Sequence, residues 1–168
     1  VVAEAAAEIN GNRLVCRARE CPMGNLVADA MLARTAGQGV EIALTNGGGL
    51  RASIDAGPVT MGEVFTVLPF QNTLSTFRVS GATLKDALEN GVSQITDGAG
   101  RFPQVAGMSF AVNPTAPVGE RIRDVMVGGT PLEADRMYSV ASNNFLRTGG
   151  DGYAMFEDAE DAYDFGPD

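Results

Sequence analysis

The sequence contains no histidine, no tryptophan, a single lysine and two cysteines among 168 residues. Histidine is the commonest metal ligand and general base, so its absence excludes Ser-His-Asp and Cys-His catalytic arrangements. The acidic residues are scattered, with no compact D-x-D cluster after a strand. An all-carboxylate metal site is therefore not expected in this chain. If the chain belongs to an enzyme, the chemical step is expected to take place elsewhere.

Long hydrophobic runs are also missing. No stretch approaches the roughly 18 apolar residues of a membrane span. No signal peptide is visible, and the sequence begins at Val1 in the middle of a pattern, which suggests a processed chain or an excised domain. The length suits a single domain over 1–168, with a core from about 9 to 156 and an acidic tail at 157–168 interpreted as a frayed end or linker.

Positive charge is scarce, and the formal net charge is -9. This balance argues against a nucleic-acid groove, where a basic face is expected. Apart from Lys85, the positive side chains are all arginines. The rigid guanidinium fork suits phosphate or carboxylate, so the arginines are the natural candidates for contacts to an anionic ligand.

The two cysteines, Cys16 and Cys21, enclose the segment "CRAREC". Without histidine they are too few for a zinc site, and redox pairs are usually spaced C-x-x-C. A small disulfide loop in an oxidising compartment is favoured, and two reduced thiols in a cytosolic protein are the alternative. A disulfide here would fix the chain that carries Arg17 and Arg19.

Hydrophobic periodicity predicts helices alternating with runs of strands, which favours an α+β fold over a doubly wound sheet. Thr60 with Glu63 forms a capping-box pattern, and Ser80 is a helix cap. Gly128 and Gly129 suit a hairpin turn. Helices are predicted over 24–35, 60–68 and 80–95, strands over 40–45, 73–79, 107–113, 121–127 and 137–143, and residues 6–17 are interpreted as mainly extended, with a turn at 10–11.

Two glycine-rich segments each follow a predicted strand: "TNGGGLR" at 45–51 and "NNFLRTGGDGYAMF" at 143–156. Glycine loses the most freedom on folding, so consecutive glycines indicate a need for bare backbone. Phe145 lies in the second segment, and Phe70 lies at a helix-to-strand junction between the two. A single phenylalanine is more often core, yet two aromatic rings beside arginines favour a nucleotide, with rings for the base and arginines for the phosphate.

Four ordered blocks, "CRARECPMGNLVADAML", "ALTNGGGLR", "TMGEVFTVLPFQNTL" and "NNFLRTGGDGYAMF", resemble the C-terminal domain of 5'-nucleotidases. That family includes bacterial UDP-sugar hydrolases of the periplasm and animal ecto-5'-nucleotidases. The resemblance covers about 9–156 and implies a mixed, layered αββα-type domain. It also implies a separate N-terminal metallophosphoesterase domain that holds two divalent metal ions. The C-terminal domain would bind the nucleotide and carry it to those metals, and alone it would be inactive.

The resemblance assigns roles to individual residues. Phe70 and Phe145 match the pair that sandwiches the base, and Asp151 matches the aspartate that bonds the ribose hydroxyls. Phenylalanine at both positions, in place of tyrosine, favours a 5'-nucleotidase or nucleotide-sugar hydrolase over a cyclic phosphodiesterase. The remaining matches are two phosphate-binding arginines, an asparagine beside them and a glycine lining the base pocket: Arg17, Arg51, Asn46 and Gly107.

Other interpretations of these residues stay open. Arg17 and Arg51 could be surface ion-pair partners among the many acidic residues, and the three glycines at 47–49 could form a simple tight turn. If they do not form a simple turn, the bare backbone of these glycines would let the phosphate end of a nucleotide approach. The expected location of the protein is periplasmic or extracellular, and the expected reaction is hydrolysis of a 5'-phosphate monoester or a nucleotide sugar. The alternative function is a nucleotide- or nucleoside-binding module without hydrolysis.

Overall fold

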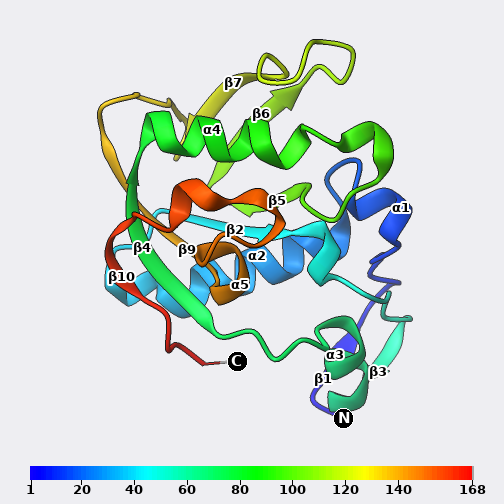
Figure 1. The fold of residues 1–168 in the computed structure, drawn as a ribbon. Coiled ribbons are helices and arrows are strands. Elements are labelled where there is room, and N and C mark those ends of the chain that lie inside the picture. Colours follow the sequence, from blue (N-terminus) through cyan, green and yellow to red (C-terminus); the bar gives the residue numbers. More distant parts are fainter. Residues whose placement is uncertain (168) are drawn as a thin grey trace.

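A five-stranded mixed sheet forms the centre of the computed structural model, which describes residues 1–167 (Figure 1). β2 and β9 run parallel, and the other neighbours are antiparallel. The carboxyl ends of β2 and β9 therefore meet at one edge of the sheet. The strands in spatial order are β10 (Glu160–Tyr163), β4 (Leu74–Ser80), β9 (Met137–Asn143), β2 (Ile42–Asn46) and β5 (Pro103–Ala106).

Among residues 1–167 the sheet is joined by two smaller sheets, five α-helices and several 3-10 turns. One antiparallel sheet joins β6 (Met108–Val112), β7 (Ile122–Val127) and β8 (Thr130–Pro131), and the other joins β1 (Ala3–Ala5) and β3 (Gly57–Val59). The helices are α1 (Arg13–Cys16), α2 (Pro22–Thr35), α3 (Met61–Val67), α4 (Gly81–Val92) and α5 (Asn144–Arg147). The α+β class is confirmed.

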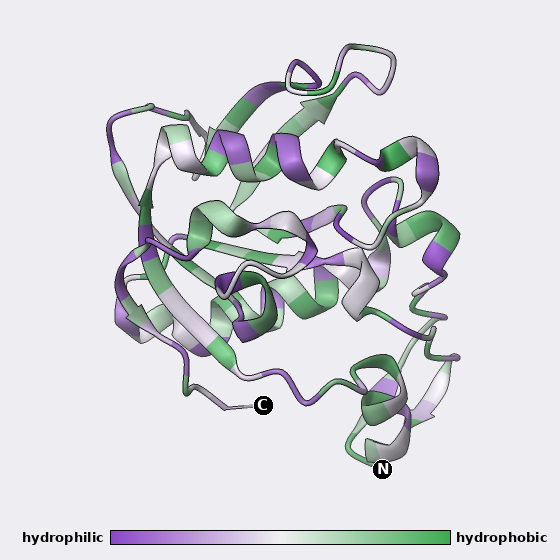
Figure 2. Ribbon diagram, viewed as in Figure 1, coloured by the Kyte–Doolittle hydropathy of each residue, from purple (hydrophilic) through white to green (hydrophobic). Residues whose placement is uncertain are grey.

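The interior strand β2 is buried on both faces, which explains its run of apolar residues. Ile42 and Leu44 face the core that contains Leu84 and Leu88 of α4. Ala43 points the other way and packs with small side chains, including Ala28 of α2. α2 and α4 therefore cover opposite faces of the sheet. Figure 2 shows hydrophobic and hydrophilic residues alternating along α4, as expected for a helix with one buried face.

The helix signals read from the sequence are confirmed. The capping box of α3 is complete, since Thr60 Oγ1 accepts from the Glu63 amide at 3.3 Å and Glu63 Oε2 accepts from the Thr60 amide at 2.7 Å. Ser80 Oγ accepts from the Thr83 amide and caps α4. The predicted helix over 80–95 ends earlier, at Val92, and a 3-10 turn follows. The hairpin at 128–129 is confirmed by the pairing of β7 with β8.

The extended interpretation of 6–17 is wrong at its carboxyl end, where α1 forms. Asn12 caps that helix by accepting from the Leu14 amide through Oδ1 at 2.9 Å. β5 was not predicted, because four residues interrupted by proline and glutamine carry no clear alternation. The missed cap and the missed strand both bear on the site described below.

The acidic tail is neither frayed nor a linker over most of its length. β10 pairs with β4 along the edge of the sheet, and Arg78 forms an ion pair with Asp161 at 3.3 Å. Further along, Thr73 Oγ1 donates to the Asp164 carbonyl at 2.6 Å, and the Leu74 amide donates to the Pro167 carbonyl at 2.9 Å. Backbone hydrogen bonds to β4 order this segment despite its many acidic side chains, and composition does not reveal such bonds. Residue 168 of the predicted tail lies outside the described residues.

Candidate functional site

Two asparagines occupy the carboxyl ends of the parallel strands β2 and β9. Asn143 Nδ2 donates to Asn46 Oδ1 at 3.2 Å and to Thr45 Oγ1 at 3.3 Å. Asn46 Nδ2 in turn donates to Asp151 Oδ2 at 2.8 Å, and Asn46 is only 4% exposed. Both ends of the Asn46 amide are thus bonded within the protein. Asn46 holds Asp151, and its predicted place beside a phosphate stays a prediction.

The glycines after β2 form a 3-10 turn, and close contacts with neighbouring backbone explain why glycine is needed there. A Cβ on Gly47 would collide with the carbonyl oxygen of Cys16. The Gly48 amide donates to the Gly100 carbonyl at 2.7 Å, and a Cβ on Gly48 would lie 2.8 Å from the Gly100 Cα. The bare backbone of these two glycines therefore accommodates neighbouring segments of the protein. A role for this backbone in letting a phosphate approach stays a prediction.

Three guanidinium groups gather beside this turn. Burial is the largest cause lowering the pKa of Arg17, followed by the positive charges of Arg13 and Arg51, while Asp151 acts in the opposite direction. Arg17 Nη1 donates to the Gly98 carbonyl at 3.4 Å, and within the described residues its buried Nε has no hydrogen-bond partner. The structure thus brings the two predicted arginines together with a third. A cluster of like charges around a partly buried cation is suited to an anionic ligand.

Sequence reasoning missed Arg13. It lies four residues before Arg17, so the two side chains share one face where the chain is helical. The interpretation of 6–17 as extended concealed this relation, because residues four apart are distant along a strand. The Asn12 cap was the signal that could have revealed it.

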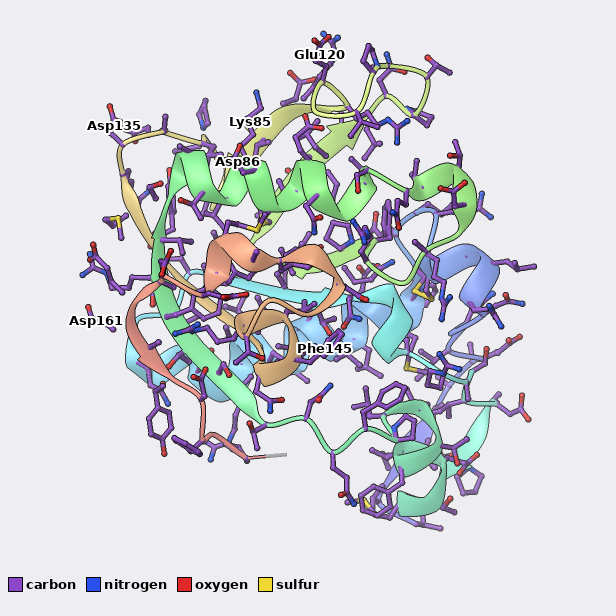
Figure 3. The ribbon with its side chains drawn as sticks, in the orientation of Figure 1. Lys85, Asp86, Glu120, Asp135, Phe145 and Asp161 are labelled. Carbon is purple, nitrogen blue, oxygen red and sulfur yellow. A yellow bond between two sulfur atoms is a disulfide. The ribbon has the colours of Figure 1, made fainter. Side chains whose placement is uncertain are left out.

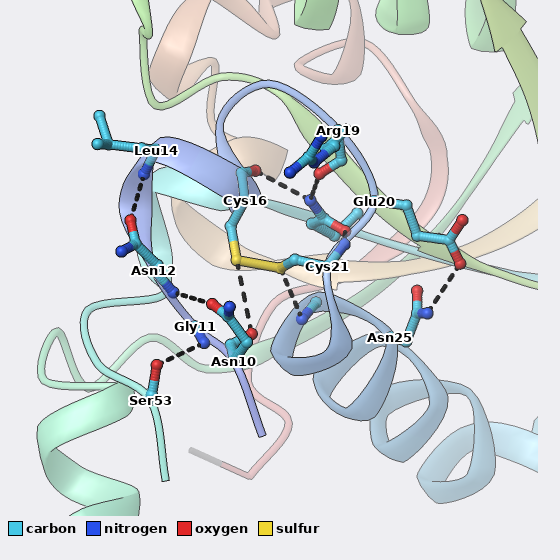
Figure 4. Close-up of a disulfide and its surroundings, with 12 residues drawn as sticks. Asn10, Gly11, Asn12, Leu14, Cys16, Arg19, Glu20, Cys21, Asn25 and Ser53 are labelled. Atoms are coloured by element: carbon cyan, nitrogen blue, oxygen red, sulfur yellow. Dashed lines mark hydrogen bonds between the residues drawn. A yellow bond between two sulfur atoms is a disulfide. The ribbon is translucent and has the colours of Figure 1, made fainter. Parts of the chain in front are cut away.

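The disulfide between Cys16 and Cys21 is present, and both residues are buried (Figure 4). Gln104 of β5 fixes the enclosed loop from within. Its Nε2 donates to the carbonyls of Cys16 and Arg19 at 2.9 and 2.8 Å, and its Oε1 accepts from the Cys21 amide at 3.1 Å. The loop that carries Arg17 is therefore anchored by one covalent bond and three hydrogen bonds.

Replacing both Cys16 and Cys21 by alanine is expected to lower the free energy of unfolding by about 2 kcal/mol, since the short disulfide restricts the unfolded chain. The measurement is urea unfolding of the variant and of the wild type. A Cys16→Ala/Cys21→Ala variant as stable as the wild type would contradict this expectation. Wild-type protein treated with a reductant without denaturant is the control. It should stay oxidised, because both sulfur-bearing residues are buried.

The two predicted aromatic residues are exposed, unlike the core phenylalanines. Phe70 is 56% exposed and Phe145 is 41% exposed, whereas Phe77 is 1% exposed. The segments that carry Phe70 and Phe145 are joined by two hydrogen bonds between Thr73 and Asn144. The Thr73 amide donates to Asn144 Oδ1 at 3.1 Å, and the Asn144 amide donates to the Thr73 carbonyl at 2.9 Å. Figure 3 shows Phe145 at α5. Both rings are therefore accessible to a ligand, and each lies a few residues or fewer from the Thr73–Asn144 contact.

The predicted cationic and aromatic groups are linked by direct contact. The Arg51 guanidinium carbon lies 5.7 Å from the centre of the Phe70 ring, within the range of a cation–π interaction. Arg51 Nη1 also donates to the Gly48 carbonyl at 3.4 Å. The structure thus places Phe70 next to the arginine cluster.

Asp151 lies in a turn with unusual backbone geometry. Its φ is 52°, in the left-handed region that residues other than glycine rarely occupy. Gly149 and Gly152 on either side also have positive φ, of 87° and 80°. Gly150 packs under Phe145, since a Cβ there would lie 2.5 Å from Cε2 of that ring. The turn therefore holds the carboxylate and the aromatic ring in a fixed relation.

Gly107 is not brought together with the other predicted residues. It links β5 to β6, with φ of 75°, and a Cβ there would collide with the carbonyl of Glu41. Glu41 precedes β2, whereas Asn46 ends it, so Gly107 lies at the opposite end of that strand. Close packing of backbone explains this glycine without a ligand. A role for it in the base pocket stays a prediction.

Two further properties of residues 1–167 concern metals and membranes. In this part of the chain no three His, Cys, Asp or Glu side chains gather closely enough to hold a metal ion. No helix formed by these residues combines the length and the apolar character needed to cross a bilayer.

The comparisons with known proteins agree on one family. The family model described as "5'-nucleotidase, C-terminal domain" matches residues 1–158. The chain is 42% identical to the trifunctional nucleotide phosphoesterase protein YfkN of Bacillus subtilis over 94% of its own length and 11% of that protein. It is 34% identical to human 5'-nucleotidase over 89% of its length and 29% of that protein.

A solved structure gives the same result. The crystal structure of a 5'-nucleotidase precursor from Thermus thermophilus superimposes with a TM-score of 0.95 at 46% identity, covering 98% of this chain and 33% of that one. The chain thus spans about a third or less of each of these three relatives. Sequence and fold lead to one conclusion: the chain belongs to the family of 5'-nucleotidase C-terminal domains.

Proposed function

We propose that this chain binds the nucleotide substrate of a metal-dependent 5'-nucleotidase and orients it for hydrolysis. The observation that carries this proposal is the convergence of three kinds of group in one region. Phe70 and Phe145 offer exposed rings for a base, Asp151 offers a carboxylate for ribose hydroxyls, and the arginine cluster offers positive charge for a phosphate.

Each group suits its part of a nucleotide. A base stacked on an aromatic ring gains about 1–3 kcal/mol, and an exposed ring is ready for such contact without rearrangement of the core. A carboxylate accepts hydrogen bonds from two hydroxyls at once. Asp151 uses Oδ2 to accept from Asn46, and among residues 1–167 its Oδ1 has no hydrogen-bond partner, so acceptor capacity remains.

The phosphate end fits the electrostatics of the cluster. Burial, followed by repulsion from Arg13 and Arg51, lowers the pKa of Arg17 and so disfavours its charged form. A phosphate placed among them relieves this repulsion and accepts charge-assisted hydrogen bonds. In a protein with a net charge of -9, this local excess of positive charge would also guide an anionic ligand to the site.

The hydrolytic step is proposed to belong to a separate N-terminal metallophosphoesterase domain with two divalent metal ions. Among residues 1–167 no three His, Cys, Asp or Glu side chains gather as ligands for such ions. The chain would then supply substrate binding and orientation, and alone it would not hydrolyse AMP. The substrate is proposed to be a 5'-phosphate monoester or a nucleotide sugar. A reading frame upstream of Val1 that encodes such a domain would separate this proposal from a binding module without hydrolysis.

We propose a periplasmic or extracellular location. The disulfide supports it, since such bonds persist in oxidising compartments. A relative named "Snake venom 5'-nucleotidase" from Macrovipera lebetinus, 33% identical over 89% of this chain and 41% of that protein, supports it as well.

The experiment that tests the proposed function compares AMP with adenosine in the wild type and in Arg51→Ala. Loss of a charge-assisted hydrogen bond is expected to weaken AMP binding about tenfold or more, because such a bond contributes about 1.5–3 kcal/mol. The dissociation constant for adenosine, which has no phosphate, should change less than about twofold. Calorimetric titration of both ligands gives the two dissociation constants.

Arg78→Ala is the matched control, since Arg78 lies on β4 and pairs with Asp161 away from the cluster. This control should leave both dissociation constants unchanged. Wild-type protein that binds neither ligand would refute the proposed function. Equal weakening of AMP and adenosine in Arg51→Ala would show that Arg51 acts through Phe70, which it contacts, and would remove the phosphate assignment.

A further inference from the structure

Besides Asn46, a second residue forms a hydrogen bond to the left-handed turn of Asp151, and this residue has no assigned role. Asn90, near the end of α4, donates from Nδ2 to the backbone carbonyl of Asp151 at 3.1 Å. Asn46 binds the Asp151 carboxylate, so the residue is held at both its side chain and its backbone. A non-glycine residue in this conformation persists only where its surroundings fix it, and these two bonds do so.

The Asn90 amide is itself oriented by Arg101. Arg101 Nη1 donates to Asn90 Oδ1 at 3.1 Å and to Ser93 Oγ at 3.2 Å. A guanidinium can only donate, so the Asn90 oxygen must face Arg101 and the Asn90 NH2 group must face Asp151. Ser93 Oγ donates to the Asn90 carbonyl at 2.6 Å and completes the arrangement. The amide orientation follows from this bonding and not from an arbitrary choice between its two ends.

Tyr153 and Gly152, which follow Asp151, also contact Arg101 and Asn90. Arg101 lies in the connection between α4 and β5. Tyr153 is fully buried, and its hydroxyl donates to the Arg101 carbonyl at 2.7 Å. Burial, with the nearby Asp151 charge, raises the pKa of Tyr153, so the phenol stays protonated and remains a donor. Gly152 lies against Asn90, since a Cβ there would be 2.7 Å from its Oδ1. Asn90 and Arg101 therefore support the turn through contacts separate from that of Asn46.

We propose that Asn90, oriented by Arg101, is a positioning residue that sets the Asp151 carboxylate for the two ribose hydroxyls. This inference rests on the proposed function and adds a specificity device to it. The ligand class is a nucleoside or nucleotide with both ribose hydroxyls. When Asn90 no longer bonds the turn, Asn46 alone fixes the Asp151 carboxylate and its direction is less well defined, while Phe70 and the arginines keep their contacts outside the turn.

The test measures binding of adenosine and of 2',3'-dideoxyadenosine to the wild type, Asn90→Leu and Asn90→Asp. Both substitutions remove the donor to Asp151, and Asn90→Asp keeps an acceptor for Arg101 and so preserves that contact in the fold. Each is expected to raise the dissociation constant for adenosine about tenfold and that for the dideoxynucleoside less than about twofold. Ser93→Ala is the control, since it leaves the Asn90–Asp151 bond in place and should preserve the preference for adenosine.

A second measurement needs no ligand. Hydrogen exchange at the Tyr153 amide, which donates to the Gly150 carbonyl across the turn, should become about tenfold faster in both Asn90 variants. Equal exchange in wild type and variants would overturn the positioning role whatever the ligand. An unchanged ratio of the two nucleoside affinities, or an equal effect of Ser93→Ala, would overturn the ribose inference alone. Wild-type protein that does not bind adenosine would refute the proposed function, and the ribose inference with it.

Discussion

Replacing either Phe70 or Phe145 by alanine is expected to raise the dissociation constant for adenosine about five- to 150-fold. Each substitution removes one stacked face of the base, a loss of about 1–3 kcal/mol. Stability should fall much less than the roughly 3–5 kcal/mol of a buried Phe→Ala substitution, because both rings are exposed. Calorimetric titration with adenosine, combined with urea unfolding of the same variants, measures both quantities.

Two control variants separate stacking from general effects of an aromatic side chain. Phe65 on α3 is 62% exposed, more than either Phe70 or Phe145, so Phe65→Ala also removes an exposed ring and should leave adenosine binding unchanged. Phe77 is buried in the core, so Phe77→Ala should lower stability strongly. The nucleotide interpretation loses its main support if Phe70→Ala and Phe145→Ala bind adenosine like the wild type and unfold like Phe77→Ala.

Local signals in the sequence predicted most of the fold correctly. The caps at Thr60 and Ser80 depend on hydrogen bonds within a few residues, so their pattern is visible in the sequence itself. The helix over 24–35 and the buried strand after it follow from hydrophobic periodicity. The failures involve distant partners. β10 forms because β4 offers a free edge, and the packing of Gly47 against Cys16 involves segments separated along the chain.

The site was predictable in part for the same reason. The resemblance named residues by type and order, and the structure brings Arg17, Arg51 and Asp151 near one another. It could not show that Asn46 is buried and bonded at both ends, since Asn143 and Asp151 are distant in sequence. Asn90 and Arg101 lie in segments without any motif, and only the arrangement of the turn reveals their contacts.

Gly47→Ala is expected to lower the free energy of unfolding by about 3 kcal/mol, at the upper end of the usual cost of overpacking. The obstacle to the new methyl group is the backbone carbonyl of Cys16, which cannot rotate aside as a flexible side chain does. Gly37→Ala is the matched control. A Cβ there meets nothing within 4 Å, so this variant should be neutral or slightly more stable than the wild type.

The disulfide gives this prediction a sharper form. Gln104 and the Cys16–Cys21 bond hold the Cys16 carbonyl against the glycine turn, so the chain there has little freedom to retreat. In a Cys16→Ala/Cys21→Ala background that freedom increases. Gly47→Ala should then lower the free energy of unfolding by about 1 kcal/mol less than it does in the wild type. A double-mutant cycle measured by urea unfolding gives this difference. Strict additivity would show that the loop does not press on the turn. A Gly47→Ala variant as stable as Gly37→Ala would show that chain packing does not require the first glycine of the turn.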